Sequence, residues 1–279
     1  MQFEVQLLRG EALDEHPTGL EAYKPSEMAR RVQTAGIAKT RLAFLPLVVL
    51  GILAGVFIGF GALFYLLVIT GAGDLSGPVR LLGGIAFSLG LILVVVGGGE
   101  LFTGNTLIVM AWAGRQISTR ALLRNWGIVY VANFVGALLL VATVLAAGTL
   151  DLMDGEVGRT AARIAADKLA LTPVAAFARA ILCNALVCLA VWLTFAAQDA
   201  TGKIFALLWP ITAFVALGFE HSVANMFLLP LGLAAGADGS IAQTAGQLAI
   251  VTLGNIVGGA GGVAITYWAC YLRGGQSPG

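Results

Sequence analysis

Glu100-Leu-Phe-Thr-Gly-Asn105 and Glu220-His-Ser-Val-Ala-Asn225 are two short polar stretches that interrupt long apolar runs. In each, a glutamate precedes an asparagine by five residues, and glycine stands just upstream, at Gly97 to Gly99 and at Gly218. A charged side chain at the centre of a membrane span costs about 2.5–3.5 kcal/mol, and irregular backbone is tolerated there only where protein or water surrounds it. The stretches therefore predict helix breaks that line a pathway. The glutamates either take part in that pathway or accept hydrogen bonds from the freed amides of their own break.

The composition around these stretches is that of a polytopic membrane protein. Only 11% of the 279 residues are charged and 58% are hydrophobic, whereas soluble domains contain roughly 25% charged residues. The formal net charge of +1 offers no basic surface for nucleic acid. A helix needs about 20 apolar residues to cross the hydrocarbon core. Charge-free runs predict six such spans, the second and fifth interrupted: about 42–71, 81–113, 124–148, 176–198, 204–237 and 244–272.

A second pair of motifs indicates an internal repeat. Asn133-Phe-Val-Gly136 in the third span matches Asn255-Ile-Val-Gly258 in the sixth at an offset of 122 residues, and the glutamate motifs match at 120. Three spans per half is an odd number, so the halves, about 42–149 and 173–273, have opposite orientations. The expected fold is all-α: six transmembrane helices in two inverted three-helix repeats, with helices 2 and 5 broken. Small residues crowd the third and sixth spans, where they either pack one subunit's helices or join subunits.

The charged residues outside the spans predict the orientation. Residues 1–41 hold twelve of them and no apolar stretch like a signal peptide, so we expect an uncleaved cytoplasmic segment with an interfacial amphipathic helix. With both termini in the cytoplasm, eleven Lys and Arg residues lie inside and five outside, as the positive-inside rule requires. Eight more charged residues fall in 151–179, between the halves, and 274–279 is expected to be a flexible tail after the six-helix domain 42–273.

His221 directly follows Glu220 and is the only imidazole in the predicted spans. Histidine changes its charge near neutral pH, so at a helix break it is a candidate donor of a proton or a hydrogen bond to an anion. The three cysteines, at positions 183, 188 and 270, form no metal-like cluster, and no metal or cofactor is expected. An intramembrane enzyme built from Glu220, His221 and Ser222 is a remote alternative, because adjacent helical residues do not face each other.

Longer motifs carry a resemblance to a known family. Gly218-Phe-Glu-His-Ser-Val-Ala-Asn-Met-Phe227 resembles the signature of the formate/nitrite transporter family, and Gly99-Glu-Leu-Phe-Thr-Gly-Asn105 resembles its second-span break. Further agreement, from about residue 25 to 273, comes from Phe87-Ser-Leu-Gly90, Asn184-Ala-Leu-Val-Cys-Leu-Ala-Val-Trp192 and Gly254-Asn-Ile-Val-Gly-Gly259. The resemblance implies an aquaporin-like protomer and a homopentamer with one pore in each subunit, in a cytoplasmic (inner) membrane.

The same resemblance assigns roles to particular residues. The substrate pathway comprises the central histidine, the hydroxyl facing it, the Glu and Asn of the break, a fourth-span amide and a vestibule lysine: His221, Thr103, Glu220, Asn225, Asn184 and Lys168. The pore constriction comprises two aromatic rings that flank the histidine and two further narrowing side chains: Phe87, Phe214, Leu91 and Phe102. At Ala175 the sequence departs from the family, since some members carry a carboxylate before the fourth span.

The implied function is the passage of small monovalent weak-acid anions. An unpaired ion costs far more to move through an apolar zone than its neutral acid does, so a proton or hydrogen bonds from His221 and Thr103 would ease the crossing. The Leu-Phe-Thr-Gly-Asn break resembles formate-associated members, which favours formate. Nitrite, hydrosulfide, acetate and lactate stay open as alternatives, as does the choice between channel-like and proton-coupled flux. The implied partners are the anion, protons, membrane lipid and other copies of the chain.

Overall fold

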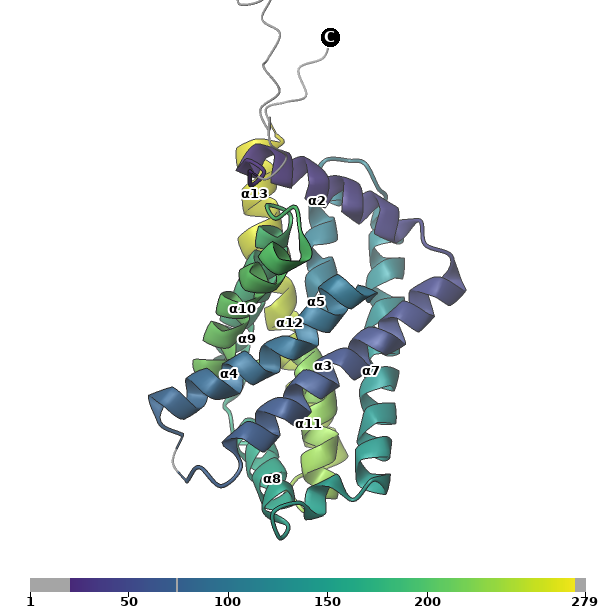
Figure 1. Cartoon of the computed structure of the whole chain (residues 1–279). Helices are drawn as coiled ribbons and strands as arrows, with labels where there is room; N and C mark the ends of the chain where they lie inside the picture. The colour runs from purple at the N-terminus through teal and green to yellow at the C-terminus, as the bar shows by residue number, and fades with distance from the viewer. Residues whose placement is uncertain (1–20, 74, 274–279) are drawn as a thin grey trace, which may run out of the picture.

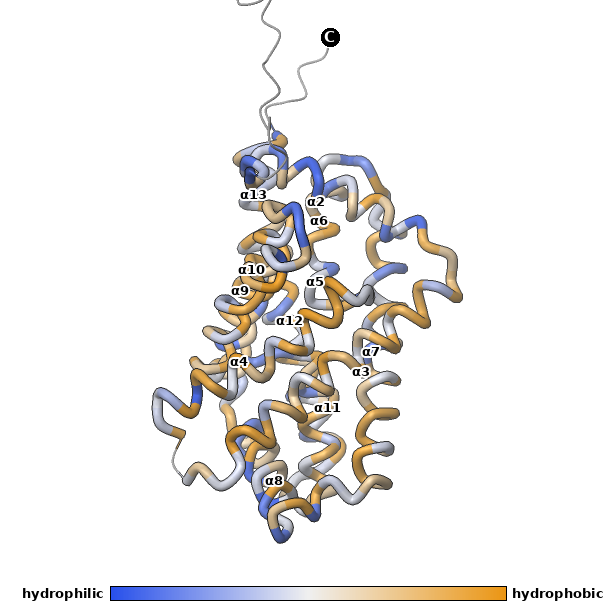
Figure 2. The backbone as a smooth tube through the Cα atoms, in the orientation of Figure 1, coloured by the Kyte–Doolittle hydropathy of each residue, from blue (hydrophilic) through white to orange (hydrophobic). Residues whose placement is uncertain are grey.

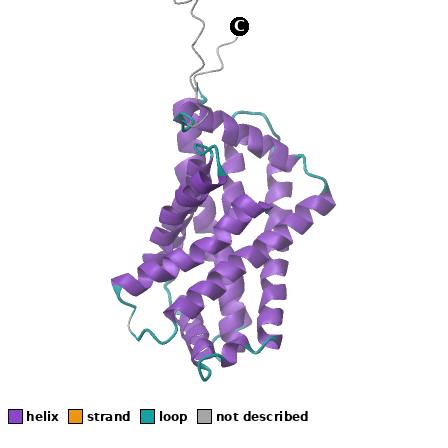
Figure 3. Cartoon of the chain, viewed as in Figure 1, coloured by secondary structure: helices purple, strands orange, loops and turns teal. Residues whose placement is uncertain are grey.

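The computed structural model describes residues 21–73 and 75–273, and these residues form helices and loops without a strand among them (Figures 1 and 3). The prediction of an all-helical fold is confirmed for this part of the chain, and the expected tail at 274–279 lies outside it. In chain order the elements are α2 (Pro25–Thr40), α3 (Phe44–Ile69), α4 (Gly77–Ile92), a π-helical segment (Leu93–Gly98), α5 (Phe102–Asn105), a 3₁₀ turn (Thr106–Ile108), α6 (Val109–Ala113), α7 (Thr119–Ala146), a 3₁₀ turn (Thr149–Asp151), α8 (Glu156–Leu169), α9 (Pro173–Thr194), α10 (Ala200–Ala216), α11 (Ser222–Ala234), α12 (Ile241–Ile256), a π-helical segment (Val257–Ile265) and α13 (Thr266–Tyr271).

Several of these helices can cross a membrane. Within the described ranges, five are long and apolar enough: Phe44–Ile69, Gly77–Gly98, Thr119–Ala146, Pro173–Thr194 and Ile241–Tyr271. Three shorter apolar helices account for the rest of the expected second and fifth spans: Phe102–Ala113, Ala200–Ala216 and Ser222–Ala234. Figure 2 shows apolar residues along the body of the molecule and hydrophilic residues gathered near α2 and α8.

Two helices begin earlier in the sequence than expected, because a capping side chain allows the first turns to include residues beside charged positions. α7 begins at Thr119, within a stretch that carries arginines at 120 and 124, because the Ser118 hydroxyl accepts the Ala121 amide at 3.2 Å. α9 begins at Pro173 because the Thr172 hydroxyl accepts the Ala175 amide at 3.3 Å. A serine or threonine at this position stabilises a helix start by satisfying an otherwise unpaired amide. Charge-free runs locate the apolar centre of a helix but not these polar first turns.

Two amphipathic helices lie at opposite ends of the molecule, α2 beside α13 and α8 beyond α11 (Figure 1). α2 buries Met28, Ala29 and Val32, and α8 packs so closely on α11 that a Cβ on Gly232 would clash with Ala161 and Ala165. The sequence indicated an amphipathic helix for the first region, whereas for 151–179 it indicated only a charged stretch. The two helices place one lysine each beside a helix break.

Close helix crossings use the glycines of the third and sixth spans. A Cβ on Gly136 of α7 would clash with the backbone of Ile52 on α3. In the other half, a Cβ on Gly258 would clash with the backbone of Ile181 on α9. These glycines therefore pack helices within one subunit, because small residues let backbones approach closely. Gly261 has open space where its Cβ would lie, so only part of the small-residue surface is used inside the protomer.

Candidate functional site

The first break is the non-helical segment between Gly98 and Phe102, and the side chain of Asn133 holds it. The Asn133 Oδ1 accepts the Phe102 amide at 2.9 Å, and its Nδ2 donates to the carbonyls of Gly51 at 2.8 Å and Glu100 at 2.9 Å. Gly98 has a φ of +95°, a conformation that suits glycine. One buried amide of α7 thus joins α3, the break and the start of α5.

The second break, between Ala216 and Ser222, repeats this arrangement with Asn255. Its Oδ1 accepts the Ser222 amide at 2.8 Å, and its Nδ2 donates to the carbonyls of Ala180 at 2.8 Å and Glu220 at 2.9 Å. Gly218 has a φ of +71°. Buried amides need partners, and at both breaks the partner comes from another helix.

Each glutamate binds one lysine and one asparagine rather than the amides freed at its own break. Glu100 accepts Lys39 Nζ at 2.6 Å and Asn105 Nδ2 at 2.7 Å. Glu220 accepts Lys168 Nζ at 2.8 Å and the Asn225 Nδ2 at 2.7 Å in the same way. The alternative that the carboxylates hold their own breaks is therefore not what the structure records. Each glutamate instead holds one lysine beside its break.

Lys39 is a member of this arrangement that the sequence analysis missed. It lies in the last turn of α2, as Lys168 lies in the last turn of α8. The two lysines are 129 residues apart in the sequence. The same offset separates Gly51 from Ala180, whose carbonyls accept the corresponding bonds from Asn133 and Asn255. Aligning the first helices of the two halves would have found Lys39, whereas the motif offsets of 120 and 122 residues do not.

The centre of the site is a buried hydrogen bond between the two halves. His221 Nε2 lies 2.9 Å from Thr103 Oγ1, and the two residues are 2% and 0% exposed. His221 is also the N-cap of α11, where its Nδ1 accepts the Ala224 amide at 3.0 Å. An acceptor nitrogen carries no proton, so the geometry selects the neutral tautomer with the proton on Nε2. That proton is donated to Thr103, whose own hydroxyl hydrogen is left for another acceptor.

One phenylalanine ring stacks on the imidazole, and a second packs against the first. Phe214 stacks on His221 with centroids 5.9 Å apart and an angle of 25° between planes. Phe87 meets Phe214 edge to face at 5.4 Å. All three side chains are at most 4% exposed. The aromatic pair thus keeps the His221–Thr103 bond in apolar surroundings.

The backbone of Thr103 is fixed from α9 and from its own turn. Its carbonyl accepts the Asn184 amide at 3.2 Å, the Thr106 hydroxyl at 2.6 Å and the Cys188 thiol at 3.5 Å. Asn184 donates as well to the carbonyl of Asn255 at 2.7 Å, which links the threonine to the second break. Asn184 Oδ1 is buried without a hydrogen-bond partner.

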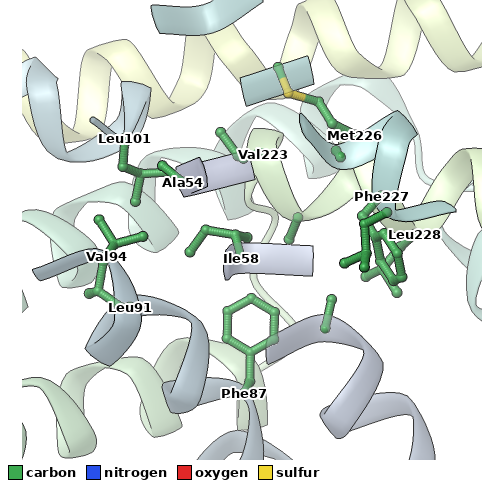
Figure 4. Packing of buried hydrophobic residues seen from close by; sticks show 14 of the residues in the cluster. Ala54, Ile58, Phe87, Leu91, Val94, Leu101, Val223, Met226, Phe227 and Leu228 are labelled. Carbon is green, nitrogen blue, oxygen red and sulfur yellow. The ribbon is translucent and has the colours of Figure 1, made fainter. Parts of the chain in front are cut away.

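Two cavities approach this centre from opposite ends. The larger, about 390 Å³, is lined by Lys39, Glu100 and Asn105 and reaches the apolar side chains of Leu91, Val94 and Leu101 (Figure 4). We call it the inner cavity.

The smaller cavity, about 70 Å³, is lined by Lys168, Glu220, Phe87, Phe214 and His221, and we call it the outer cavity. The two share no lining residue within the described chain. Phe87 and Leu91 are one turn apart on α4, so the partition between the cavities spans about 6 Å of that helix.

Of the four residues predicted for the constriction, three line these cavities: Phe87, Phe214 and Leu91. Phe102 packs edge to face on Tyr130 at 5.0 Å and on Trp126 at 6.1 Å. It lines neither cavity, and its neighbour Leu101 lines the inner one. At a break the direction of a side chain follows the local backbone rather than helical periodicity.

The site offers hydrogen bonds and fixed charges but no nucleophile–base pair. Ser222 Oγ is buried without a hydrogen-bond partner, and both nitrogens of His221 are engaged elsewhere, by Thr103 and the Ala224 amide. No group of three His, Cys, Asp or Glu in the described residues could hold a metal ion.

Comparison with known proteins agrees with this geometry. A family model described as Formate/nitrite transporter matches residues 26–269. The chain belongs to the formate/nitrite transporter family. This is a family of integral membrane channels and transporters, and the sequence-based resemblance is confirmed.

Two curated relatives of this family member illustrate the match. The chain is 39% identical over 269 residues to the formate channel FocA of Escherichia coli (strain K12), covering 89% of this chain and 94% of that protein. It is 41% identical over 266 residues to a probable formate transporter of Methanothermobacter thermautotrophicus, covering 89% and 97%.

Solved structures of the family share the fold. A pentameric formate channel with formate bound superposes with a TM-score of 0.77 at 43% sequence identity, covering 83% of this chain and 98% of that one. An ion channel of the same family superposes with a TM-score of 0.80 at 27% identity, covering 88% and 98%.

Proposed function

We propose that this chain passes small monovalent weak-acid anions, formate first, across a membrane, with the His221–Thr103 pair assisting at the barrier. The observation that carries the proposal is the buried 2.9 Å bond of this pair between two cavities, each with a lysine on its wall. The relatives named formate channels support the same anion.

The tautomer of His221 favours hydrogen-bond donation over proton donation by the imidazole. A neutral ring that gave up its Nε2 proton would become an imidazolate, and a ring protonated on both nitrogens would lose the cap on Ala224. Thr103 accepts a hydrogen bond from the Nε2–H group and turns its own hydroxyl hydrogen toward the anion. An anion that has taken a proton from a hydronium ion in a cavity leaves a water molecule behind and crosses as the neutral acid, which avoids the cost of an unpaired ion in an apolar zone.

The surrounding residues have matching proposed roles. Phe87, Phe214 and Leu91 exclude bulk water, and Phe102 supports the first break by packing on Trp126 and Tyr130. Lys168 attracts anions to the outer cavity, and Glu220 holds the lysine in position by accepting its ammonium group. The proposed pathway therefore comprises the histidine, the threonine, the vestibule lysine and the amides and acid that position them: His221, Thr103, Lys168, Asn184, Glu220 and Asn225.

The proposed architecture is that of six crossings in two inverted halves, with the breaks in the second and fifth. It includes a homopentamer with one pore per subunit, in the cytoplasmic membrane with both termini in the cytoplasm. The pentamer of the similar formate channel supports the assembly, and the duplicated contacts around Asn133 and Asn255 support the inverted repeat. Mixing wild-type and His221→Phe subunits tests the separate pores, since flux should fall in proportion to the mutant fraction.

Uptake of labelled formate and nitrite into proteoliposomes, with and without an imposed pH gradient, tests the function. We expect formate uptake that increases when the outside is made more acidic. Uptake of nitrite, hydrosulfide, acetate or lactate in preference to formate would assign the other substrate within the same mechanism. An absence of flux for the whole panel from a protein of pentameric native mass would contradict the proposal.

A further inference from the structure

The walls of the two cavities differ in charge. In the outer cavity, Lys168 is paired with Glu220 at 2.8 Å, and His221 is neutral. In the inner cavity, Lys39 is paired with Glu100 at 2.6 Å, and a second cation, Lys203, lines the same space. The charged side chains that line the outer cavity thus cancel, whereas those of the inner cavity leave one positive charge.

Lys203 has no counter-ion in the described part of the chain. It lies in the first turn of α10 and is half-buried. Asp199, four residues earlier, is the acid nearest in sequence, but its carboxylate caps α10 by accepting the Gly202 amide at 2.6 Å. A partly buried ammonium group without a carboxylate partner favours an anion in the space beside it.

The space beside Lys203 suits a small anion in both size and position. The inner cavity of about 390 Å³ has room for a small anion together with several waters. Its far wall is apolar, formed by Leu91, Val94 and Leu101 (Figure 4). An anion in this cavity is therefore held among its charged residues before it reaches the apolar zone and the buried Thr103.

We propose that Lys203 is an anion-binding residue of the inner cavity, for formate or another small monovalent anion, and that it makes anion capture stronger from the inner side than from the outer side. The inference rests on the proposed transport function and adds a residue and an asymmetry to it. Lys39 cannot supply this asymmetry, since its bond to Glu100 has a counterpart in Lys168 and Glu220.

The test is the concentration of formate that gives half-maximal flux, measured separately in inside-out and right-side-out membrane vesicles of cells that lack their own formate channels. Removing one charge close to the anion corresponds to a change of roughly fivefold in water. We expect Lys203→Gln to raise the half-saturating concentration about three- to fivefold from the inner face only, and Lys203→Arg to preserve it. The difference should fade at 1 M salt, where the screening length is about 3 Å.

Arg115→Gln is the matched control, because Arg115 is a cation of the α6–α7 loop that lines neither cavity. It should change neither face. Two results would overturn this inference while leaving the transport function intact, provided that the wild type carries formate. In the first, Lys203→Gln leaves the half-saturating concentration unchanged on both faces; in the second, it changes that concentration equally on both faces. If wild-type vesicles carry neither formate nor nitrite, both proposals fall. Native mass confirms that each variant still assembles.

Discussion

The break at Glu100 and the break at Glu220 are held by corresponding contacts in the same order along the chain. In each, an asparagine of another helix accepts the freed amide, and the glutamate joins a lysine to a second asparagine. The side chains at the centre differ, because one break supplies a hydroxyl, Thr103, and the other an imidazole, His221. The two breaks thus share their supporting contacts, while the side chains at the centre differ.

The largest expected effect comes from removing the asparagine that supports either break. Asn133→Ala and Asn255→Ala each remove three hydrogen bonds of a fully buried amide. Each variant leaves buried backbone groups unpaired, at about 1–3 kcal/mol per group. We expect both to lose assembly or thermal stability to a similar extent, measured by melting in detergent and native mass.

Thr143→Val is the control for this pair, since its hydroxyl bonds only the Leu139 carbonyl of its own helix and is exposed. It should melt like the wild type. Strong loss in one asparagine variant together with wild-type behaviour in the other would show that the two supports are not equivalent.

The second prediction concerns the groups that distinguish the breaks. His221→Phe and Thr103→Val should each lower formate flux at least about tenfold, which corresponds to about 1.4 kcal/mol of barrier, while the pentamer persists. Because the two side chains act through one hydrogen bond, the double variant should lose little more than either single one. Thr103→Ser keeps the hydroxyl and should keep most of the flux. Additive losses in the double variant would contradict a shared role.

The third prediction compares the two lysine–glutamate pairs. The side chains of Lys168 and Glu220 are 16% and 3% exposed, against 33% and 7% for Lys39 and Glu100. Breaking a buried pair leaves an uncompensated charge and costs up to about 3–5 kcal/mol. Solvent reduces this cost for the more exposed pair. Lys168→Gln should therefore lower the melting temperature more than Lys39→Gln does.

Neutralising Glu220 as well tests whether the unpaired charge causes the loss of stability. Glu220→Gln added to Lys168→Gln should recover most of the lost stability, because no unpaired charge is left. The double variant should also show weaker formate uptake at low concentration through the loss of Lys168. A double variant as unstable as the single one would indicate that the lysine supports α8 in another way.

The smallest effect is expected from Asn125, whose bond to Asn105 has no counterpart among the described residues of the second half. Asn105 Nδ2 also donates to Asn125 Oδ1 at 2.9 Å, and Asn125 Nδ2 donates to the Lys39 carbonyl at 3.2 Å. In the second half, Gln247 takes the place of Asn125 and donates to the Lys168 carbonyl at 2.9 Å, whereas Asn225 Nδ2 donates to Glu220. Asn125→Ala should cost about 1–2 kcal/mol of stability and leave flux from the outer face unchanged. A loss as large as that of Asn133→Ala would place Asn125 among the main supports.

The sequence predicted apolar helical spans because a helix that crosses a membrane needs a run of about 20 residues with few or no charges. It predicted the meeting of His221 with Thr103 only through the resemblance, since the two are 118 residues apart. The sequence did not predict the pairing of Lys39 with Glu100. Lys39 lies on a short polar helix outside the spans, and the pattern of charge-free runs does not show where such a helix packs. The direction of Phe102 could not be predicted either, because it depends on the extended backbone of Leu101 at the break.

The cap on α11 has a consequence for how protons move. An imidazole relays a proton when it receives it on one nitrogen and releases it from the other. In His221, Nδ1 accepts the amide at the start of α11 and Nε2 is bonded to Thr103, so neither nitrogen is free to take up a proton that the other then releases. The ring therefore cannot conduct protons from one side to the other by itself. For the proposed transport we therefore expect protons to cross on the weak acid, and we expect little proton flux when no weak acid is present.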